Sequence, residues 1–334
     1  MTPSVIAADV RAALLAALQR GLPLAARPFA AIARDVGCTE DEAVAEVARL
    51  RAEGMVRRFG AVFDTRRLGY KSVLCAVSAT DSDAAAAAVA PLAGVTHCYL
   101  REPSSSSDVS IPTLWFTLST PSDIFPAMQA DVRRRLAPHV SGQVHFLPAT
   151  RRYKVDVVFG TATRAREEST IDDLGPVTAN DRAVISALQG DTDVRPDYFA
   201  AISGRLGMKE WDLLSTLEMW RRSGRLKRIG LLLAHRNAGY SANGMCCWRI
   251  DGETLAAGRA LAERDEVTHC YERPPVPEFD YNLFAMIHAR SPHEAERQFA
   301  ALREVVDGVS LGPVPAVMLM STREYKKTSM TFFA

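Results

Sequence analysis

Two segments of the chain share the five-residue sequence VTHCY, and each is followed two residues later by an arginine. Alternate positions of the two segments carry a histidine, a tyrosine and an arginine: His97, Tyr99 and Arg101 in the first, and His269, Tyr271 and Arg273 in the second. Because successive side chains of a β-strand point to opposite faces, this spacing places the three groups in one row. Imidazole exchanges protons near neutral pH, and guanidinium binds a carboxylate through two hydrogen bonds. Each row could therefore hold an anion and protonate it.

Such a row is costly to bury beneath helices, because an unpaired polar group loses roughly 2–7 kcal/mol of hydration. We therefore expect both rows on sheet faces that no helix covers. If the two faces approach each other, they enclose a cavity lined by proton donors and cations. A single histidine in a strand is more often an ordinary half-buried residue, but the repetition of the whole row argues against that interpretation.

Other basic and aromatic residues recur in the two copies. Arg binds anions through a fork of N–H groups and Lys binds them as a point charge. The further positions predicted to hold an anion are Arg57, Arg58, Arg151, Tyr153, Lys154, Arg228, Arg323, Tyr325 and Lys326. For Lys154 and Lys326, a solvated basic strand edge is an equally good interpretation. His235, next to Arg236, competes with the row histidines as proton donor.

The matching extends over nearly the whole of each half. The VTHCY segments are 172 residues apart, and the same offset relates ATRRYK (149–154) to STREYK (321–326). RRFGAVFDTRRLGY (57–70) corresponds to KRIGLLLAHRNAGY (227–240) with an offset of 170. The chain is therefore predicted to be a tandem duplication. A polar, charged segment bounded by Gly and Pro separates the halves and is predicted to be the linker.

Each half has the same order of predicted elements. Two helices followed by a strand indicate a winged helix-turn-helix. In the first half, Thr39 and Glu42 form a capping box at the start of the second helix. The following strand–helix–strand–strand–helix–strand order is ferredoxin-like, so the fold class is α+β. The predicted segments are winged helix-turn-helix domains at 1–64 and 178–236, ferredoxin-like domains at 65–155 and 237–334, and a linker at 156–177.

Composition restricts the partners. The chain has 334 residues, 48% of them hydrophobic, and a net charge of +1, so no overall field favours nucleic acid or an acidic membrane. No apolar run is long enough to span a bilayer, and the N-terminus lacks the features of a signal peptide. The six cysteines form no CxxC pair, so we expect a reducing cytoplasm without disulfides or a zinc site.

The plan of winged helix plus ferredoxin-like domain resembles the feast/famine (Lrp/AsnC) transcription regulators, which makes DNA binding the first function to consider. A recognition helix should begin with residues that meet phosphates and base edges. The candidate helices begin instead with acidic residues: Asp41, Glu42, Glu46, Glu210 and Asp212. We therefore expect no nucleic-acid partner, and we interpret the helix-turn-helix as packing or as a pocket wall.

Several motifs in order resemble the siroheme decarboxylases. RRFGAVFDTRRLGY, VTHCYLRE followed by LWFTL, and PATRRYK resemble one subunit type of that family; AHRNAGYSANGMCCW, VTHCYERP, YNLFAMIH and STREYKK resemble the partner type. The resemblance covers nearly the whole chain except the linker and points to the fused form, associated with haem d1 biosynthesis. It implies a carboxy-lyase that converts the C12 and C18 acetates of siroheme to methyls, giving 12,18-didecarboxysiroheme.

The resemblance also implies roles for residues. Siroheme needs a cleft with apolar walls, to which Trp115 would contribute, and a ring of cations for its carboxylates. His97 and His269 would be general acids or positioning groups, although a histidine could instead ligate the substrate iron. No separate cofactor and no protein-bound metal are expected. The two halves would pair within one chain, and a homo-oligomer stays open.

The two halves differ in their other histidines. His235 and His288 occur only in the second half, where the first half has residues near Thr65 and Ser119. The two rows are therefore not equivalent: either one is productive, or each acts on a different acetate. The alternatives to an enzyme are an Lrp/AsnC-like ligand-sensing regulator and a carrier that binds a tetrapyrrole without changing it.

Overall fold

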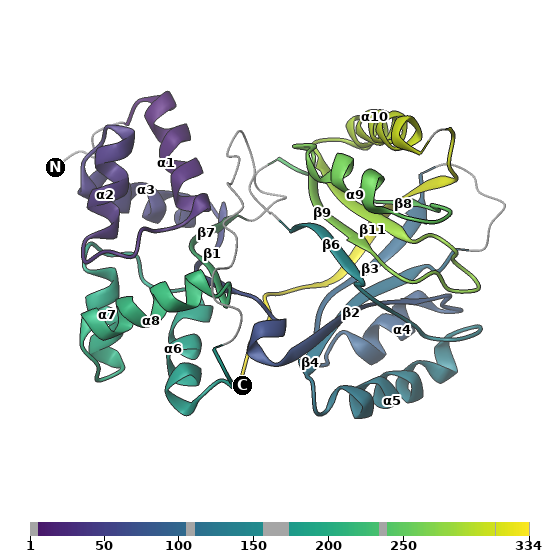
Figure 1. Ribbon diagram of the computed structural model, residues 1–334, viewed down its shortest axis with the longest axis horizontal. Coiled ribbons are helices and arrows are strands. Elements are labelled where there is room, and N and C mark those ends of the chain that lie inside the picture. Colours follow the sequence, from purple (N-terminus) through teal and green to yellow (C-terminus); the bar gives the residue numbers. More distant parts are fainter. Residues whose placement is uncertain (1–5, 105–110, 156–173, 234–238, 311, 334) are drawn as a thin grey trace. The chain divides into compact units, whose positions relative to one another are not determined.

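The computed structural model describes residues 6–104, 111–155, 174–233, 239–310 and 312–333. Two compact units are present, and each combines corresponding segments of both halves (Figure 1). The smaller unit contains the described residues of Met1–Gly69, Val158–Ala238 and Thr331–Ala334, and the larger contains those of Tyr70–Val157 and Gly239–Met330. His235 and most of the predicted linker lie outside the described residues.

The smaller unit holds the helix-turn-helix elements of both halves. Each half contributes three helices and a strand: α1 (Ala8–Arg20), α2 (Pro28–Val36), α3 (Glu40–Ala52) and β1 (Val56–Phe63), then α6 (Ala179–Gln189), α7 (Tyr198–Arg205), α8 (Glu210–Arg222) and β7 (Leu226–Leu233). The capping box expected at Thr39 and Glu42 is present at the start of α3. Phe29, Phe59 and Tyr198 pack edge to face or tilted across the two halves, with ring centroids 5.8–6.4 Å apart.

The strand that was expected to form a wing within each half instead pairs with its counterpart. β1 and β7 form an antiparallel two-stranded ribbon in which Gly60 pairs with Gly230. A Cβ on Gly60 would lie 2.3 Å from the carbonyl oxygen of Gly190, and one on Gly230 would lie 2.4 Å from that of Leu18. The end of the first helix of each half therefore lies against the other half's strand, and only glycine permits this approach.

The larger unit contains one antiparallel sheet with helices. Its elements from the first half are β2 (Tyr70–Val77), α4 (Ser82–Val89), β3 (Val95–Pro103), β4 (Leu114–Pro121), α5 (Phe125–Leu136), β5 (His145–Pro148) and β6 (Arg151–Val155). The second half gives β8 (Ala242–Trp248), α9 (Leu255–Ala262), β9 (Val267–Glu272), β10 (Leu283–Ala289), α10 (Pro292–Val309) and β11 (Ala316–Lys327). Two short 3-10 turns complete the described elements, Arg66–Leu68 in the smaller unit and Ala137–His139 in the larger.

The order of the strands joins the halves. It is β5-β2-β4-β3-β11-β8-β10-β9-β6, so β3 pairs with β11 and β6 pairs with β9 across the halves. β5 and β6 lie at the two ends of this order, yet only two residues separate them in the chain. Two residues span about 10 Å at most, so the sheet must curve until its two ends approach each other. The larger unit is thus a closed arrangement whose inner face belongs to both halves.

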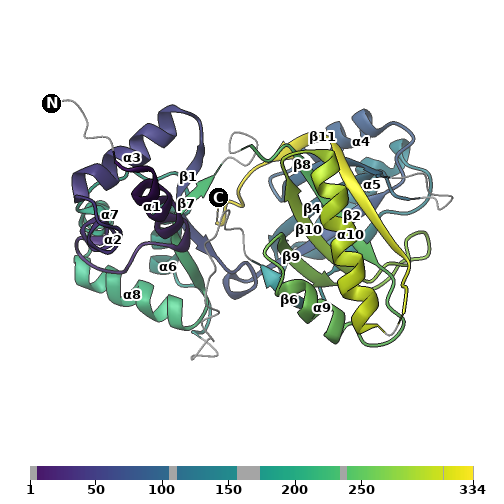
Figure 2. The ribbon, with the colours of Figure 1, turned by 90° about the horizontal axis from the view of Figure 1, so that it is seen from above.

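Strand periodicity separates an outer from an inner face. Along β10, Leu283, Ala285 and Ile287 belong to the core beneath the helices, whereas Phe284 and Met286 belong to a different apolar cluster. Helices α9 and α10 cover the outer face of the second half, and α4 and α5 cover that of the first (Figures 1 and 2).

The two helix-free faces meet at an apolar cluster, here called the inner cluster. Its buried members come from both halves: Ala76, Trp115, Leu147, Met245, Cys247, Phe279, Tyr281, Phe284, Val317 and Leu319. The two helix-free faces therefore meet at this cluster, and the cavity expected between them stays a prediction. The α+β fold with duplicated winged-helix and ferredoxin-like elements is confirmed, apart from the exchanged wing strand.

Candidate active site

The predicted rows form on β3 and β9. In the first row the ring of His97 lies 6.2 Å from that of Tyr99, and the guanidinium carbon of Arg101 lies 5.2 Å from the centre of the tyrosine ring. In the second row the corresponding distances, for His269, Tyr271 and Arg273, are 6.1 Å and 4.9 Å. The strand spacing has therefore placed imidazole, phenol and guanidinium side by side twice, with each arginine over a tyrosine face.

Both rows lie on the inner face. Arg101 Nη1 donates to the carbonyl oxygen of Leu319 over 3.2 Å, and Arg273 donates to that of Leu147. Both leucines belong to the inner cluster. The prediction that the rows occupy the helix-free faces is therefore confirmed, and the two arginines are held in the same way in the two halves.

Burial affects both row arginines. It lowers the pKa of Arg101 and that of Arg273 to about 10, with nearby tyrosine and cysteine groups acting in the opposite direction. Both remain cations at neutral pH. A fixed, poorly hydrated cation interacts with a carboxylate more strongly than a solvated one, so these arginines are suited to binding an acidic ligand.

The threonine of each VTHCY motif contacts the histidine that follows it. His97 Nδ1 lies 2.9 Å from Thr96 Oγ1, and His269 Nδ1 lies 3.1 Å from Thr268 Oγ1. Thr268 Oγ1 donates its own proton to the carbonyl oxygen of Met286, so it accepts a hydrogen bond from His269 Nδ1–H. This contact leaves Nε2 as the nitrogen that gains or loses a proton. The repeated threonine is the sequence signal for this contact, because it precedes the histidine in both VTHCY segments.

His288 is a third histidine on the inner face. It pairs with Asn243 across β8 and β10, and its Nδ1–H donates to the carbonyl oxygen of Ile287 over 2.9 Å. Burial, followed by the nearby His269, Lys327 and Arg101, lowers the pKa of His288 to about 3. His288 is therefore neutral at physiological pH, with an unprotonated Nε2.

The first half has no equivalent of this third histidine. Ser119, which pairs with Ser72, occupies the matching position on β4. The rows are alike, but their surroundings differ, as the unequal histidine content of the halves had indicated. Asn243 Oδ1 also accepts a bond of 3.4 Å from Arg101 Nη2, which links the first row to the side chains around His288.

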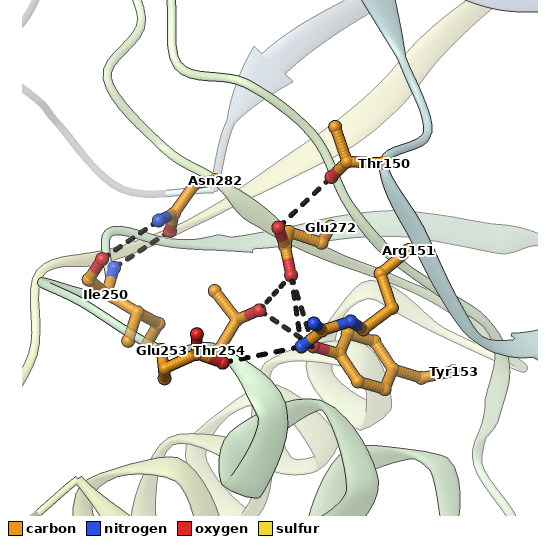
Figure 3. A network of polar contacts seen from close by, with 8 residues as sticks. All are labelled: Thr150, Arg151, Tyr153, Ile250, Glu253, Thr254, Glu272 and Asn282. Atoms are coloured by element: carbon orange, nitrogen blue, oxygen red, sulfur yellow. Dashed lines mark hydrogen bonds and ion pairs between the residues drawn. The ribbon is translucent and has the colours of Figure 1, made fainter.

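Arg151, Tyr153 and Lys154 were predicted to bind the anion, but they lie on the helix-covered face. The hydroxyl of Tyr153 is 2.7 Å from Thr254 Oγ1 and donates to Glu272 over 3.3 Å (Figure 3). Arg151 Nη1 lies 3.8 Å from the same Glu272 carboxylate (Figure 3), and Lys154 donates to a backbone carbonyl at the end of α9. These side chains bind β6 to the helix layer and point away from the rows, so we do not include them in the candidate site.

Their counterparts in the second half behave in the same way. Arg323 and Tyr325 both bind the Asp83 carboxylate at the start of α4. Lys326 Nζ donates to the carbonyl oxygens of Ala90 and Leu92 over 2.7 and 3.0 Å. All six side chains are thus directed to the helix layer, and a bulge after Arg152 and after Glu324 places each lysine on the side of the preceding arginine and tyrosine.

The residues between them share a face with the rows, and sequence reasoning missed them. Arg152 pairs with Tyr271, and Glu324 pairs with Tyr99. Directly opposed residues of antiparallel strands project to the same face. Lys327 pairs with His97 and lies close enough to His288 to lower its pKa. Arg152 and Glu324 alternate with the arginine and tyrosine of each TRxYK motif, and this spacing was a signal that they lie on the opposite face. The bulges have no comparable signal in the sequence.

Trp115 was predicted to line the cleft but is part of the packed inner cluster. It is 1% exposed, its ring lies 5.3 Å from that of Phe279, and its Nε1–H donates to the carbonyl oxygen of Pro112 over 2.7 Å. Its packing and its hydrogen bond are thus satisfied within the protein, so we also exclude it from the direct ligand contacts.

Arg57, Arg58 and Arg228 belong to the β1–β7 ribbon of the smaller unit. Burial, together with repulsion from Arg57 and Arg228, lowers the pKa of Arg58 to about 10. The structure therefore groups these three cations with one another, and it describes them within a unit separate from the rows.

The described part of the chain also bears on metals and membranes. Within it, no group of three or more His, Cys, Asp or Glu side chains is arranged to hold a metal ion. All six cysteines are free thiols. None of the helices in the described ranges combines the length and the apolar character needed to cross a bilayer.

Comparison with known proteins first defines the class. A family model described as the AsnC-like ligand binding domain matches residues 67–154 and 237–326. A second model, described as the siroheme decarboxylase NirDL-like HTH domain, matches residues 12–57. The two sheet halves thus belong to a ligand-binding class, in agreement with polar rows on their shared face.

Full-length relatives define the family. The chain is 32% identical over 328 residues to a siroheme decarboxylase of Hydrogenobacter thermophilus, covering 96% of this chain and 94% of the relative. It is 34% identical to the siroheme decarboxylase NirDL subunit of Paracoccus denitrificans, covering 97% of both. A crystal structure of the siroheme decarboxylase NirDL superposes with a TM-score of 0.71 at 27% identity, covering 98% of this chain and 95% of that one. The chain belongs to the siroheme decarboxylase family and is a carboxy-lyase.

Proposed function

We propose that this protein removes carbon dioxide from the C12 and C18 acetates of siroheme and leaves methyl groups, which gives 12,18-didecarboxysiroheme for haem d1 biosynthesis. The observation that carries the proposal is the pair of His–Tyr–Arg rows on the shared helix-free face. A structure of a relative is described as a complex of NirDL with an iron-uroporphyrin III analogue. We infer that the inner faces of this chain bind a tetrapyrrole as well.

The reaction needs few groups from the protein. Each acetate loses its carboxylate as carbon dioxide, and the bonding electron pair left on the CH2 carbon delocalises into the macrocycle. One proton added to that carbon completes the methyl group. The iron belongs to the substrate, so the proposal requires no further cofactor. Residues of the chain orient the carboxylates, exclude water and supply the proton.

We assign the proton transfer to Nε2 of His97 and of His269. In each case the Nδ1 contact with threonine orients the ring, and histidine is the most common general acid in enzymes. Arg101 and Arg273 would hold carboxylates. A row histidine that instead ligated the siroheme iron would change the absorption spectrum of the bound substrate when it is replaced, so a binding spectrum separates the two roles.

The test is anaerobic incubation with siroheme followed by mass spectrometry. We expect the loss of two carbon dioxide molecules from the wild-type reaction. His97→Ala and His269→Ala should slow turnover while leaving binding largely intact, whereas His293→Ala, at an exposed position on α10, is the matched control and should be unaffected. Tight binding with an unchanged substrate mass would identify a carrier instead of an enzyme.

The setting of the reaction is also part of the proposal. The free thiols of the six cysteines suit a reducing compartment, and we place the reaction in the cytoplasm. Pairing of β3 with β11 and of β6 with β9 means that one chain supplies both rows. We therefore propose that a single chain contains a complete site, whether or not further copies associate.

A further inference from the structure

The two rows carry opposite charges beside their tyrosines. On β6, Arg152 pairs with Tyr271 of the second row. At the equivalent place on β11, Glu324 pairs with Tyr99 of the first row. Both pairings end at a bulge immediately afterwards, so the local backbone pattern is the same on the two strands. The duplication has kept the geometry and changed the sign of the charge.

The second row therefore contains two cations at its arginine end. Arg273 lies over Tyr271, and the neighbouring Arg152 adds a repulsion that helps to lower the pKa of Arg273 after the larger effect of burial. Arg273 Nε is buried and has no hydrogen-bond partner among the described residues. Like charges gathered on a buried face are stabilised when an anion lies between them.

The first row has a carboxylate, not a guanidinium, at the equivalent place on the sheet. Arg101 lies over Tyr99, and the carboxylate of Glu324 shares the face on which they lie. An anion approaching Arg101 from this direction would meet the carboxylate of Glu324. Repulsion of this kind discriminates against one binding mode as effectively as attraction favours another.

We propose that Arg152 and Arg273 form a subsite for a carboxylate that the reaction leaves in place, and that Glu324 excludes a carboxylate from the equivalent position beside Arg101. The identity of the anion rests on the proposed function. Because the two rows are otherwise similar, the difference in charge selects one of two half-turn-related orientations of the macrocycle. Each row histidine then faces a defined acetate.

The test is a binding titration with iron uroporphyrin III, a carboxylate-rich probe whose absorption reports binding without turnover. Replacement of Arg152 by Gln removes a charge-assisted contact and should weaken binding about tenfold. Arg151→Gln is the matched control, because its side chain projects to the other face and binds Glu272; it should change the affinity by less than about twofold. Circular dichroism and the melting temperature confirm folding, and Arg152→Lys should retain part of the affinity.

Exchange of the charges gives the decisive comparison. Arg152→Glu should weaken binding more than Arg152→Gln. The double variant Arg152→Glu/Glu324→Arg should recover the affinity to within a few fold of wild type, because the subsite moves to the other row and the probe binds after a half turn. A double variant as weak as Arg152→Glu, or equal losses for Arg151→Gln and Arg152→Gln, would overturn the proposal. If wild type binds the probe through Arg152 but leaves siroheme unchanged, the proposed function is refuted while the proposed carboxylate subsite is supported.

Discussion

Replacement of His288 by asparagine tests whether the third inner-face histidine is held neutral. Asparagine retains a donor near the position of Nδ1, so the bond to the carbonyl oxygen of Ile287 can be kept while the titrating group is removed. The surrounding His269, Lys327 and Arg101 each disfavour a proton on His288, in addition to burial. The substitution therefore removes the free-energy cost of keeping His288 unprotonated in the folded protein and changes little else.

The pKa gives the size of that cost. In the folded protein the pKa of His288 is about 3, against an ordinary value near 6.5 in the unfolded chain. Between these values the unfolded chain binds a proton that the folded chain does not, so stability falls as the pH is lowered. At pH 4.5 the cost is about 3 kcal/mol, and at pH 7.5 it is close to zero. Residual water around this half-buried ring reduces it to roughly 2 kcal/mol.

Urea unfolding at pH 7.5 and 4.5 measures this difference. Tryptophan fluorescence reports on both units, since Trp115 and Trp248 are buried in the larger and Trp220 in the smaller, and circular dichroism reports on the whole chain. Between the two pH values, wild type should lose roughly 2 kcal/mol more of its unfolding free energy than His288→Asn does. The exposed His293→Asn variant should follow wild type. If wild type and His288→Asn lose stability equally, His288 is not held neutral in the way described.

Two substitutions test the packing within each of the two units. Gly230→Ala should destabilise the smaller unit by about 3 kcal/mol in calorimetry, because its Cβ would lie 2.4 Å from the carbonyl oxygen of Leu18. The control Gly204→Ala has open space around it and should be neutral or slightly stabilising. Lys326→Met should lower the unfolding free energy by about 1–2 kcal/mol, since it removes the bonds to the end of α4, yet leave iron-uroporphyrin binding unchanged; a large loss of binding would return Lys326 to the site.

The sequence predicted those features that depend on local period and on repetition. Alternation along VTHCYLR and VTHCYER placed each row on one face, and hydration cost placed that face away from the helices. The duplication indicated that two such faces could approach each other. These inferences needed no knowledge of which strands pair. A strand with one polar and one apolar row of side chains is oriented by that difference alone.

Features that depend on long-range pairing were not accessible in this way. The bulges on β6 and β11 arise where each strand crosses to the other half, and they place Lys154 and Lys326 on the same face as the arginine and tyrosine that precede them. The pairing of β1 with β7 has the same origin, since a wing strand next to its own helices gives no local sign that it will bind its duplicate.

The central claim is that the two row histidines provide the protons for decarboxylation, and a double variant tests it most directly. His97→Ala/His269→Ala should bind siroheme with nearly the wild-type affinity and release almost none of its carbon dioxide under anaerobic conditions, while wild type yields the product that lacks two carboxyl groups. Full conversion by the double variant, at the wild-type rate, would contradict the account.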